Sequence, residues 1–283
     1  MTVPLLDLPG VTSVVLNIGS NIGPVMPKES AGPCATGIAF EPIVPHLIRA
    51  HPQIYVVSTA VVAVSGGSLV SMYTYNKNGV SSSLSKASTT GEFWNNNKSR
   101  GDDKSKFVPS LTLETILQSI PAHIDIPYIK TDMQGYDFAA LRSGRTALLK
   151  RGIKNIETET FWNDLYHYEH VYNDLCRDWI PHMIELGYIY DLRRENEGYC
   201  PPENFETLEK AQQTCNDFIS ANPIRQKTNL DTKFVCNVMW RLASVPSTEK
   251  KDPYDFPVLP AASNNKQKVP YTYTTDEYNS CFK

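Results

Sequence analysis

The sequence predicts an α/β fold built on a single doubly wound, mostly parallel sheet, with inserted loops and an extended C-terminal tail. Apolar segments of strand type alternate with segments of helical periodicity along most of the chain. The segment 54–62 is apolar without alternation, as expected of a strand buried on both faces of a parallel sheet. Candidate polar residues follow several predicted strands directly, and such sheets bind ligands at the carboxyl ends of their strands.

The first predicted strand, 14–18, ends in a turn that contains Gly19 and Gly23. Gly19 can adopt backbone angles closed to other residues, and it allows a ligand to lie directly on the main chain. An ordinary strand and turn with two glycines is the alternative interpretation. The third glycine of the dinucleotide fingerprint is missing at the required spacing, which disfavours a nicotinamide- or flavin-dependent oxidoreductase.

The second predicted strand, 36–42, contains Glu41, which lies about 20 residues after Gly19. An acid at this spacing in a doubly wound sheet binds the ribose hydroxyls of a nucleotide, although a solvated charge at a strand end is also possible. The third strand, 54–62, contains Ala60. It is followed by Gly66-Gly67 and by the alternating segment 68–75, a pattern that predicts a hairpin.

The polar segment 76–106 is long for a loop inside a compact domain, which favours a lid over the site or disorder. The remaining elements follow from periodicity and from turn residues. We expect helices at 45–50, 111–120, 136–150, 173–186 and 205–220, and strands at 126–132, 153–158, 188–192 and 234–242.

One domain is expected over residues 1–243, with an insertion at about 193–233, followed by a tail at 244–283 rich in Pro, Lys and Asn. The formal charge of −3 gives no electrostatic footprint for nucleic acid. No apolar run approaches the ~20 residues that cross a bilayer, and the first residues do not resemble a signal peptide. The six cysteines show no paired spacing, so we expect reduced thiols, with Cys200 and Cys215 as the exceptions, and a cytoplasmic location.

Five motifs in order carry a resemblance to a known family over roughly half of the chain. They are Asn17-Ile18-Gly19-Ser20-Asn21-Ile22-Gly23, Phe40-Glu41-Pro42, the small-residue segment Gly79 to Leu84, Leu111-Thr112-Leu113-Glu114, and Lys130-Thr131-Asp132-Met133-Gln134-Gly135. The chain resembles the FkbM-type S-adenosylmethionine-dependent methyltransferases, which are class I, Rossmann-like enzymes. Two positions depart from the family pattern: Asn17 replaces an aspartate and Gln134 replaces a glutamate.

The resemblance implies S-adenosyl-L-methionine as the cofactor and O-methylation of a hydroxyl on a small molecule or glycan as the activity. The two amide-for-acid changes leave a non-catalytic cofactor-binding module as the alternative. The residues that the resemblance and the strand ends place around the cofactor are Asn17, Gly19, Ser20, Asn21, Gly23, Glu41, Pro42, Ala60 and Asp132.

Five residues are candidates for catalysis. Asp132 ends a central strand and is the expected positioning or basic carboxylate, although it could instead cap the following helix. Lys130 is either its charge partner or a surface lysine. Glu159 follows the next strand, and His167 is a candidate general base, as is His170. Glu157 and Glu159 could together hold a divalent metal, but the resemblance does not call for one.

Overall fold

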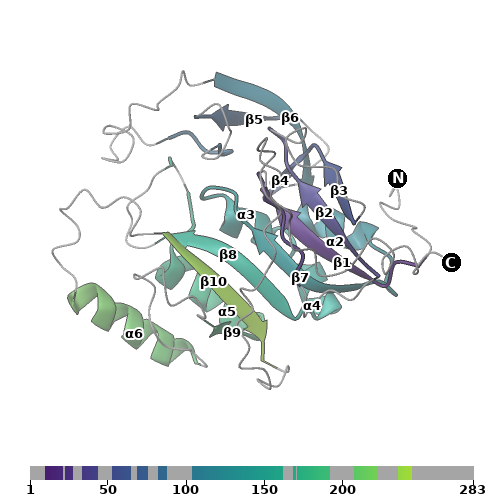
Figure 1. Cartoon of the computed structure of the whole chain (residues 1–283). Coiled ribbons are helices and arrows are strands. Elements are labelled where there is room, and N and C mark those ends of the chain that lie inside the picture. Colours follow the sequence, from purple (N-terminus) through teal and green to yellow (C-terminus); the bar gives the residue numbers. More distant parts are fainter. Residues whose placement is uncertain are drawn as a thin grey trace, which may run out of the picture.

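The computed structural model describes residues 10–21, 23–27, 34–43, 53–64, 69–75, 82–87, 104–161, 168–169, 171–191, 207–221 and 235–243. Its main feature is a seven-stranded sheet in the order β3-β2-β1-β7-β8-β10-β9 (Figure 1). The strands are β1 (Ser13–Ile18), β2 (Ala35–Phe40), β3 (Ile54–Val57), β7 (Asp125–Thr131), β8 (Asn155–Phe161), β9 (Tyr188–Asp191) and β10 (Val235–Leu242).

The sheet is mostly parallel, because within its described part only β10 runs antiparallel to its neighbours β8 and β9. The chain passes from β1 outwards to β2 and β3 and then crosses to β7 on the other side of β1. The strand order therefore reverses beside β1, and a reversal of this kind opens a crevice at the carboxyl ends of the strands. The predicted α/β class is confirmed, and the sheet is compatible with a Rossmann-like fold.

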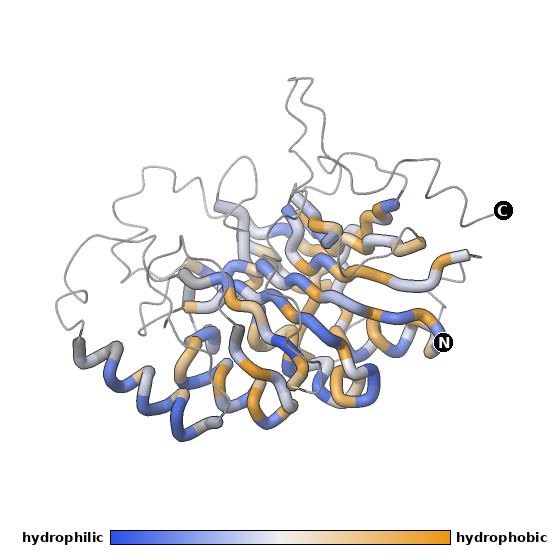
Figure 2. The backbone as a smooth tube through the Cα atoms, turned by 60° about the horizontal axis from the view of Figure 1, so that its bottom comes forward, coloured by the Kyte–Doolittle hydropathy of each residue, from blue (hydrophilic) through white to orange (hydrophobic). Residues whose placement is uncertain are grey.

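The helices that the structure describes cover one face of the sheet. They are α2 (Leu113–Ser119), α3 (Asp137–Arg142), α4 (Arg145–Arg151), the π-helical turn η2 (Leu175–Trp179) and α5 (Ile180–Glu185), with α6 (Leu208–Ala221) beyond α5. Trp179 of η2 stacks on Trp240 of β10 with ring centroids 6.1 Å apart, and both are fully buried. Figure 2 shows the apolar strands at the centre and α6, with several hydrophilic positions, at the periphery.

The opposite face carries a smaller core, to which β1, β2, β3, β7 and β10 contribute side chains. Val25 and Met26 of the turn after β1 complete this core. Among the described helices, none is both long and apolar enough to cross a lipid bilayer.

The predicted third strand is wrong as a single element, because it divides between two sheets. Residues 54–57 form β3, whereas β4 (Ala60–Val62) pairs in parallel with β6 (Lys104–Thr112) in a separate three-stranded sheet. The predicted hairpin is also wrong: β5 (Leu69–Thr74) pairs antiparallel with β6, not with β4. The sequence pattern does not reveal a strand partner more than 30 residues away.

Two helices differ from the prediction at their boundaries. The helix expected at 111–120 begins at Leu113, because β6 extends through Thr112, whose hydroxyl accepts the Thr115 N–H and caps α2. The helix expected at 136–150 is divided at Gly144 into α3 and α4. The helix expected at 45–50 and the tail at 244–283 lie outside the described residues.

The prediction of reduced thiols is wrong for Cys34 and Cys176, whereas Cys215 was one of the two expected exceptions. Cys176 of η2 and Cys215 of α6 form a disulfide across a Cα–Cα distance of 6.0 Å, and Cys34 is disulfide-bonded as well. The cysteines lie far apart in sequence, so spacing alone does not reveal the pairing. The first of these bonds attaches the predicted insertion helix to the main body.

Candidate active site

A cleft, partly open to solvent, runs along the carboxyl ends of β2, β1 and β7. The smaller sheet contributes one wall through β4, β5 and the segment 82–84. The lining residues are Gly19, Asn21, Phe40, Glu41, Pro42, Thr59, Ala60, Val61, Met72, Ser82, Leu84, Asp132, Met133 and Gln134.

Gly19 lies where β1 meets the end of β7. Its φ is +72°, its N–H donates to Phe40 O at 2.9 Å, and a Cβ at this position would lie 2.2 Å from Asp132 O. The Asp132 N–H in turn donates to Ile18 O at 2.9 Å. Any side chain at residue 19 would therefore push the two strand ends apart, which gives this glycine a steric as well as a conformational role.

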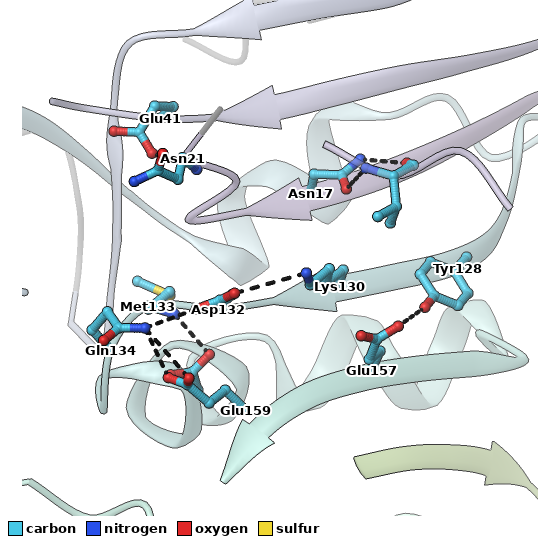
Figure 3. A network of polar contacts seen from close by, with 12 residues as sticks. Asn17, Asn21, Glu41, Tyr128, Lys130, Asp132, Met133, Gln134, Glu157 and Glu159 are labelled. Atoms are coloured by element: carbon cyan, nitrogen blue, oxygen red, sulfur yellow. Dashed lines mark hydrogen bonds and ion pairs between the residues drawn. The ribbon is translucent and has the colours of Figure 1, made fainter. Parts of the chain in front are cut away.

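Glu41 lies in the cleft at the end of β2 and is only 5% exposed. Its two carboxylate oxygens accept the N–H groups of Asn21 and Ile43, each at 2.8 Å. Asn21 has a left-handed φ of 47°, so this hydrogen bond also fixes a strained turn (Figure 3). Glu41 therefore stabilises the local backbone as well as lining the cleft. The sequence did not predict the first of these roles.

Asn17 is buried in β1 and does not line the cleft. Its side-chain amide donates to Val25 O at 3.0 Å and its amide oxygen accepts the Val25 N–H at 2.7 Å (Figure 3). A carboxylate at this position could accept the N–H but could not donate to the carbonyl. The asparagine therefore matches both backbone groups of Val25, and this pairing fixes the turn beneath the cleft.

The other predicted cofactor residues fall into two groups. Pro42 and Ala60 line the cleft. Ser20 and Gly23 form the turn itself, in which the Gly23 N–H donates to Ser20 O at 3.0 Å. The Ser20 hydroxyl is buried and makes no hydrogen bond to the part of the chain that the structure describes.

Asp132, Gln134 and Glu159 form a cluster at the β7 end of the cleft (Figure 3). The Gln134 amide donates to Asp132 Oδ1 at 3.1 Å and to the Glu159 oxygens at 3.2 and 3.4 Å. Lys130 Nζ lies 3.7 Å from Asp132 Oδ2, which confirms the charge-partner interpretation of this lysine. The Asp132 side chain is 34% exposed, whereas Glu159 is 9% exposed, so Asp132 is the carboxylate accessible from the cleft.

Burial raises the pKa of the Glu159 carboxyl well above its ordinary value, and the nearby Asp132 and Asp137 raise it further. The same cause, burial, raises the pKa of Asp137 from 3.8 to about 7, with Asp132 as the second contribution. Asp137 Oδ1 accepts the Met133 N–H at 3.0 Å and Oδ2 accepts the Gly135 N–H at 3.3 Å. Asp137, not Asp132, therefore stabilises the turn before α3, and no side chain caps that helix at Tyr136.

Gln134 is held from two further sides. Tyr168 Oη donates to its side-chain oxygen at 3.2 Å, and Ser83 Oγ donates to its backbone carbonyl at 2.9 Å. Gln134 has a left-handed φ of 54°, and the next residue, Gly135, has a φ of +93°. A Cβ at Gly135 would lie 2.9 Å from the Phe161 ring. Sequence analysis missed Tyr168 and Ser83, because only the folded chain brings them to this turn. It also missed Asp137, although this residue lies within four positions of the two amides that it accepts.

Glu157 does not join the Glu159 cluster. It is buried and accepts a hydrogen bond from the Tyr128 hydroxyl (Figure 3). Within the described ranges no group of three or more His, Cys, Asp or Glu side chains is arranged to hold a metal ion. His167 and His170 lie outside the described residues.

The geometry supplies a partly open cleft with a carboxylate at each end, Glu41 fixed by backbone amides and Asp132 by the Gln134 amide. The family model of the methyltransferase FkbM domain matches residues 17–190, which is more than half of the chain and includes the whole cleft. No curated protein and no solved structure is significantly similar to the chain.

Proposed function

Because the chain belongs to the methyltransferase FkbM domain family, we propose that it is an S-adenosyl-L-methionine-dependent O-methyltransferase that acts on a hydroxyl group of a small molecule or glycan. The observation that supports this best is the cleft that joins Glu41 to Asp132 across the Gly19 turn. We also propose that the sheet is the doubly wound sheet of class I methyltransferases.

The residues of the cleft fit the cofactor. Glu41 lines the cleft with a carboxylate, the group type that accepts hydrogen bonds from ribose hydroxyls, and the apolar side chains of Phe40, Pro42 and Val61 beside it suit an adenine ring. At the other end, the exposed Asp132 carboxylate suits a positively charged methionine part. When bound, S-adenosyl-L-methionine supplies a methyl group on a sulfonium sulfur, and the carbon–sulfur bond breaks with both electrons left on sulfur as the acceptor oxygen bonds to the methyl carbon.

Asp132 is the proposed proton acceptor for the hydroxyl substrate. It is the accessible carboxylate of the cluster, and the Gln134 amide and Lys130 hold it in place. These two contacts fix the position of the carboxylate at the β7 end of the cleft. A general base of this kind contributes ~10²–10⁴-fold to the rate. Glu159 is less accessible and has a raised pKa, so its proposed role is to position Gln134.

Calorimetry with S-adenosyl-L-methionine tests the cofactor assignment. We expect saturable heat and a rise in melting temperature with cofactor concentration, since a ligand that binds only the native state stabilises it. The absence of both at millimolar cofactor would refute the proposal.

The catalytic role is tested by Asp132→Asn, which preserves size and removes charge and basicity. We expect turnover to fall ~100-fold or more, while the cofactor Kd changes less than tenfold. Asp125→Asn is the matched control, because it makes the same substitution at the exposed opposite end of β7. Normal turnover of Asp132→Asn would move the base to another residue.

The second candidate function is a non-catalytic module that binds the cofactor. Gln134 favours this function. It stands where the family pattern has a glutamate, and its side-chain amide donates hydrogen bonds to both Asp132 and Glu159. This module predicts cofactor binding without transfer to any of a broad panel of hydroxylated acceptors. One product with the added mass of a methyl group would exclude it.

The compartment and the partners remain proposals. The sequence favours the cytoplasm, whereas disulfides at Cys176–Cys215 and at Cys34 are characteristic of oxidising compartments. We propose that the chain matures in such a compartment, and mass spectrometry of the native protein after alkylation of free thiols tests this. A hydroxyl-bearing acceptor is the proposed partner, and neither nucleic acid nor membrane is required.

A further inference from the structure

One face of the main sheet is buried although little of the described chain lies over it. Tyr128 of β7, Glu157 of β8 and Met239 and Arg241 of β10 are each at most 8% exposed. Their registers place them on the face that also carries Val15 and Asn17, away from α2, α4 and α5; in Figure 1, α5 lies behind β10. Of the described segments, only 23–27 packs on this face, and it contacts the β1 and β2 side.

Cys34 supplies a second observation. It precedes β2 at the amino-terminal edge of the sheet, where the Thr12 N–H donates to its carbonyl at 3.2 Å. It is disulfide-bonded, and its partner is neither Cys176 nor Cys215, since these are bonded to each other. The remaining cysteines are Cys200, Cys236 and Cys281.

Position in the sheet separates these three. Cys236 pairs with Thr160 at the carboxyl-terminal edge, and four strand spacings separate β10 from β2. The lateral distance alone is roughly 20 Å, far beyond the ~7 Å limit on the Cα distance of a disulfide. Cys200 lies in the connection between β9 and α6. β9 is the edge strand at the other side of the sheet from β2. Cys281 is the cysteine without such a restraint.

The segment 244–283 begins in the right place to reach Cys34. At the end of β10, the Leu242 N–H donates to Lys154 O at 3.0 Å and the Ala243 N–H donates to Gly187 O at 2.9 Å. The chain therefore leaves the sheet at the same amino-terminal edge, beside the buried patch. About six extended residues span the ~20 Å to β2, and many more separate Ala243 from Cys281.

We propose that the segment 244–283 is a strap that crosses the face formed by Tyr128, Glu157, Met239 and Arg241 and is anchored by a Cys34–Cys281 disulfide. Its five prolines disfavour a helix and suit an extended crossing. Formation of the bond oxidises two thiols, which release two protons and pass two electrons to a dithiol–disulfide oxidant of the folding compartment; that oxidant is reduced to its dithiol.

Peptide mapping tests the anchor. Trypsin cleavage of the alkylated, unreduced full-length protein yields peptide 29–49, which contains Cys34, and peptide 269–283, which contains Cys281. We expect these two as one linked species that separates on reduction. Linkage of peptide 29–49 to a peptide that contains Cys200 or Cys236, or its recovery in alkylated form, would overturn the proposal.

Hydrogen exchange tests the covering. In a chain that ends at Ala243, we expect the amides of β8 and β10 to exchange at least ~10-fold faster than in the full chain, while those of α2 change little. If the truncated chain does not fold, Cys281→Ser in the full chain serves instead, with an expected fall in melting temperature of about 5–10 °C. Unchanged exchange in a folded truncated chain, or an unchanged melting temperature of Cys281→Ser, would refute the strap.

Discussion

Single buried side chains around the cleft are matched to particular backbone groups. Asn17 satisfies both the N–H and the carbonyl of Val25, Glu41 accepts two amides, and Asp137 accepts the Met133 and Gly135 amides. A buried group that loses its partner costs about 1–3 kcal/mol, so the residue type at each position is constrained by the fold itself. This explains the asparagine at residue 17 without reference to the cofactor.

Replacement of Asn17 by aspartate tests this explanation. The new carboxylate would accept the Val25 N–H but would face the Val25 carbonyl without a proton to donate. We expect the free energy of unfolding at pH 7 to fall by about 1–3 kcal/mol. Burial raises the pKa of such an acid, so its stabilising contribution is present at low pH and is lost as pH rises. Urea denaturation at pH 5 and pH 7 should therefore show a smaller loss at pH 5; an equal loss would contradict the donor argument.

Asp137 gives a second prediction at this scale, because its folded pKa of about 7 lies above the ordinary 3.8. The native state then holds a proton that the unfolded state has released. This contribution to stability is complete below pH ~4 and is lost as pH rises through ~7. Relative to Asp137→Asn, which does not titrate, the unfolding free energy of the native protein should fall between pH 4 and pH 7. Parallel stability curves for the two proteins would show that the Asp137 pKa is not raised.

At the scale of elements, the sequence predicted the central strands and the edge where the site lies. Apolar runs that end in Gly19, Glu41 and Asp132 were sufficient, because the carboxyl ends of parallel strands meet at one edge. Glu159 was predicted to follow its strand, but it lies inside β8, which extends to Phe161. The divided strand 54–62, the β5–β6 pairing and the division of the helix at Gly144 were not predictable, since each depends on contacts between distant segments. The supports of Gln134 were missed for the same reason: Ser83 and Tyr168 come from connections far from β7.

Gly144 makes one of these contacts between distant segments, with Leu113 of α2. A Cβ there would lie 2.7 Å from Leu113 Cγ, so α2 approaches the junction of α3 and α4 more closely than any side chain allows. We expect Gly144→Ala to lower the free energy of unfolding by about 1–3 kcal/mol through overpacking. In a double-mutant cycle with Leu113→Ala, which removes the colliding atoms, the combined loss should be less than the sum of the single losses. If the two losses are additive, Gly144→Ala destabilises the protein through its own backbone conformation and not through a collision with Leu113.

At the scale of the whole molecule, the cleft and the disulfide that attaches α6 lie on different parts of the chain. Cys176 and Cys215 join η2 to α6, and neither residue lines the cleft. Among the described elements, α6 contacts chiefly α5 and η2, and many of its positions are hydrophilic (Figure 2). The bond therefore contributes stability to the peripheral helix, while the site depends on the sheet.

The double variant Cys176→Ser/Cys215→Ser separates these two contributions. A disulfide across 39 residues restricts the unfolded chain and typically contributes about 2–4 kcal/mol. We expect a loss of that size in urea denaturation and faster amide exchange in α6, because the covalent link to η2 would be lost and its contacts with α5 and η2 would remain. The affinity for S-adenosyl-L-methionine should stay within twofold, since Gly19, Glu41 and Asp132 are held by strand pairing and local hydrogen bonds. A cofactor affinity that falls together with the protection of α6 would show that this helix supports the cleft.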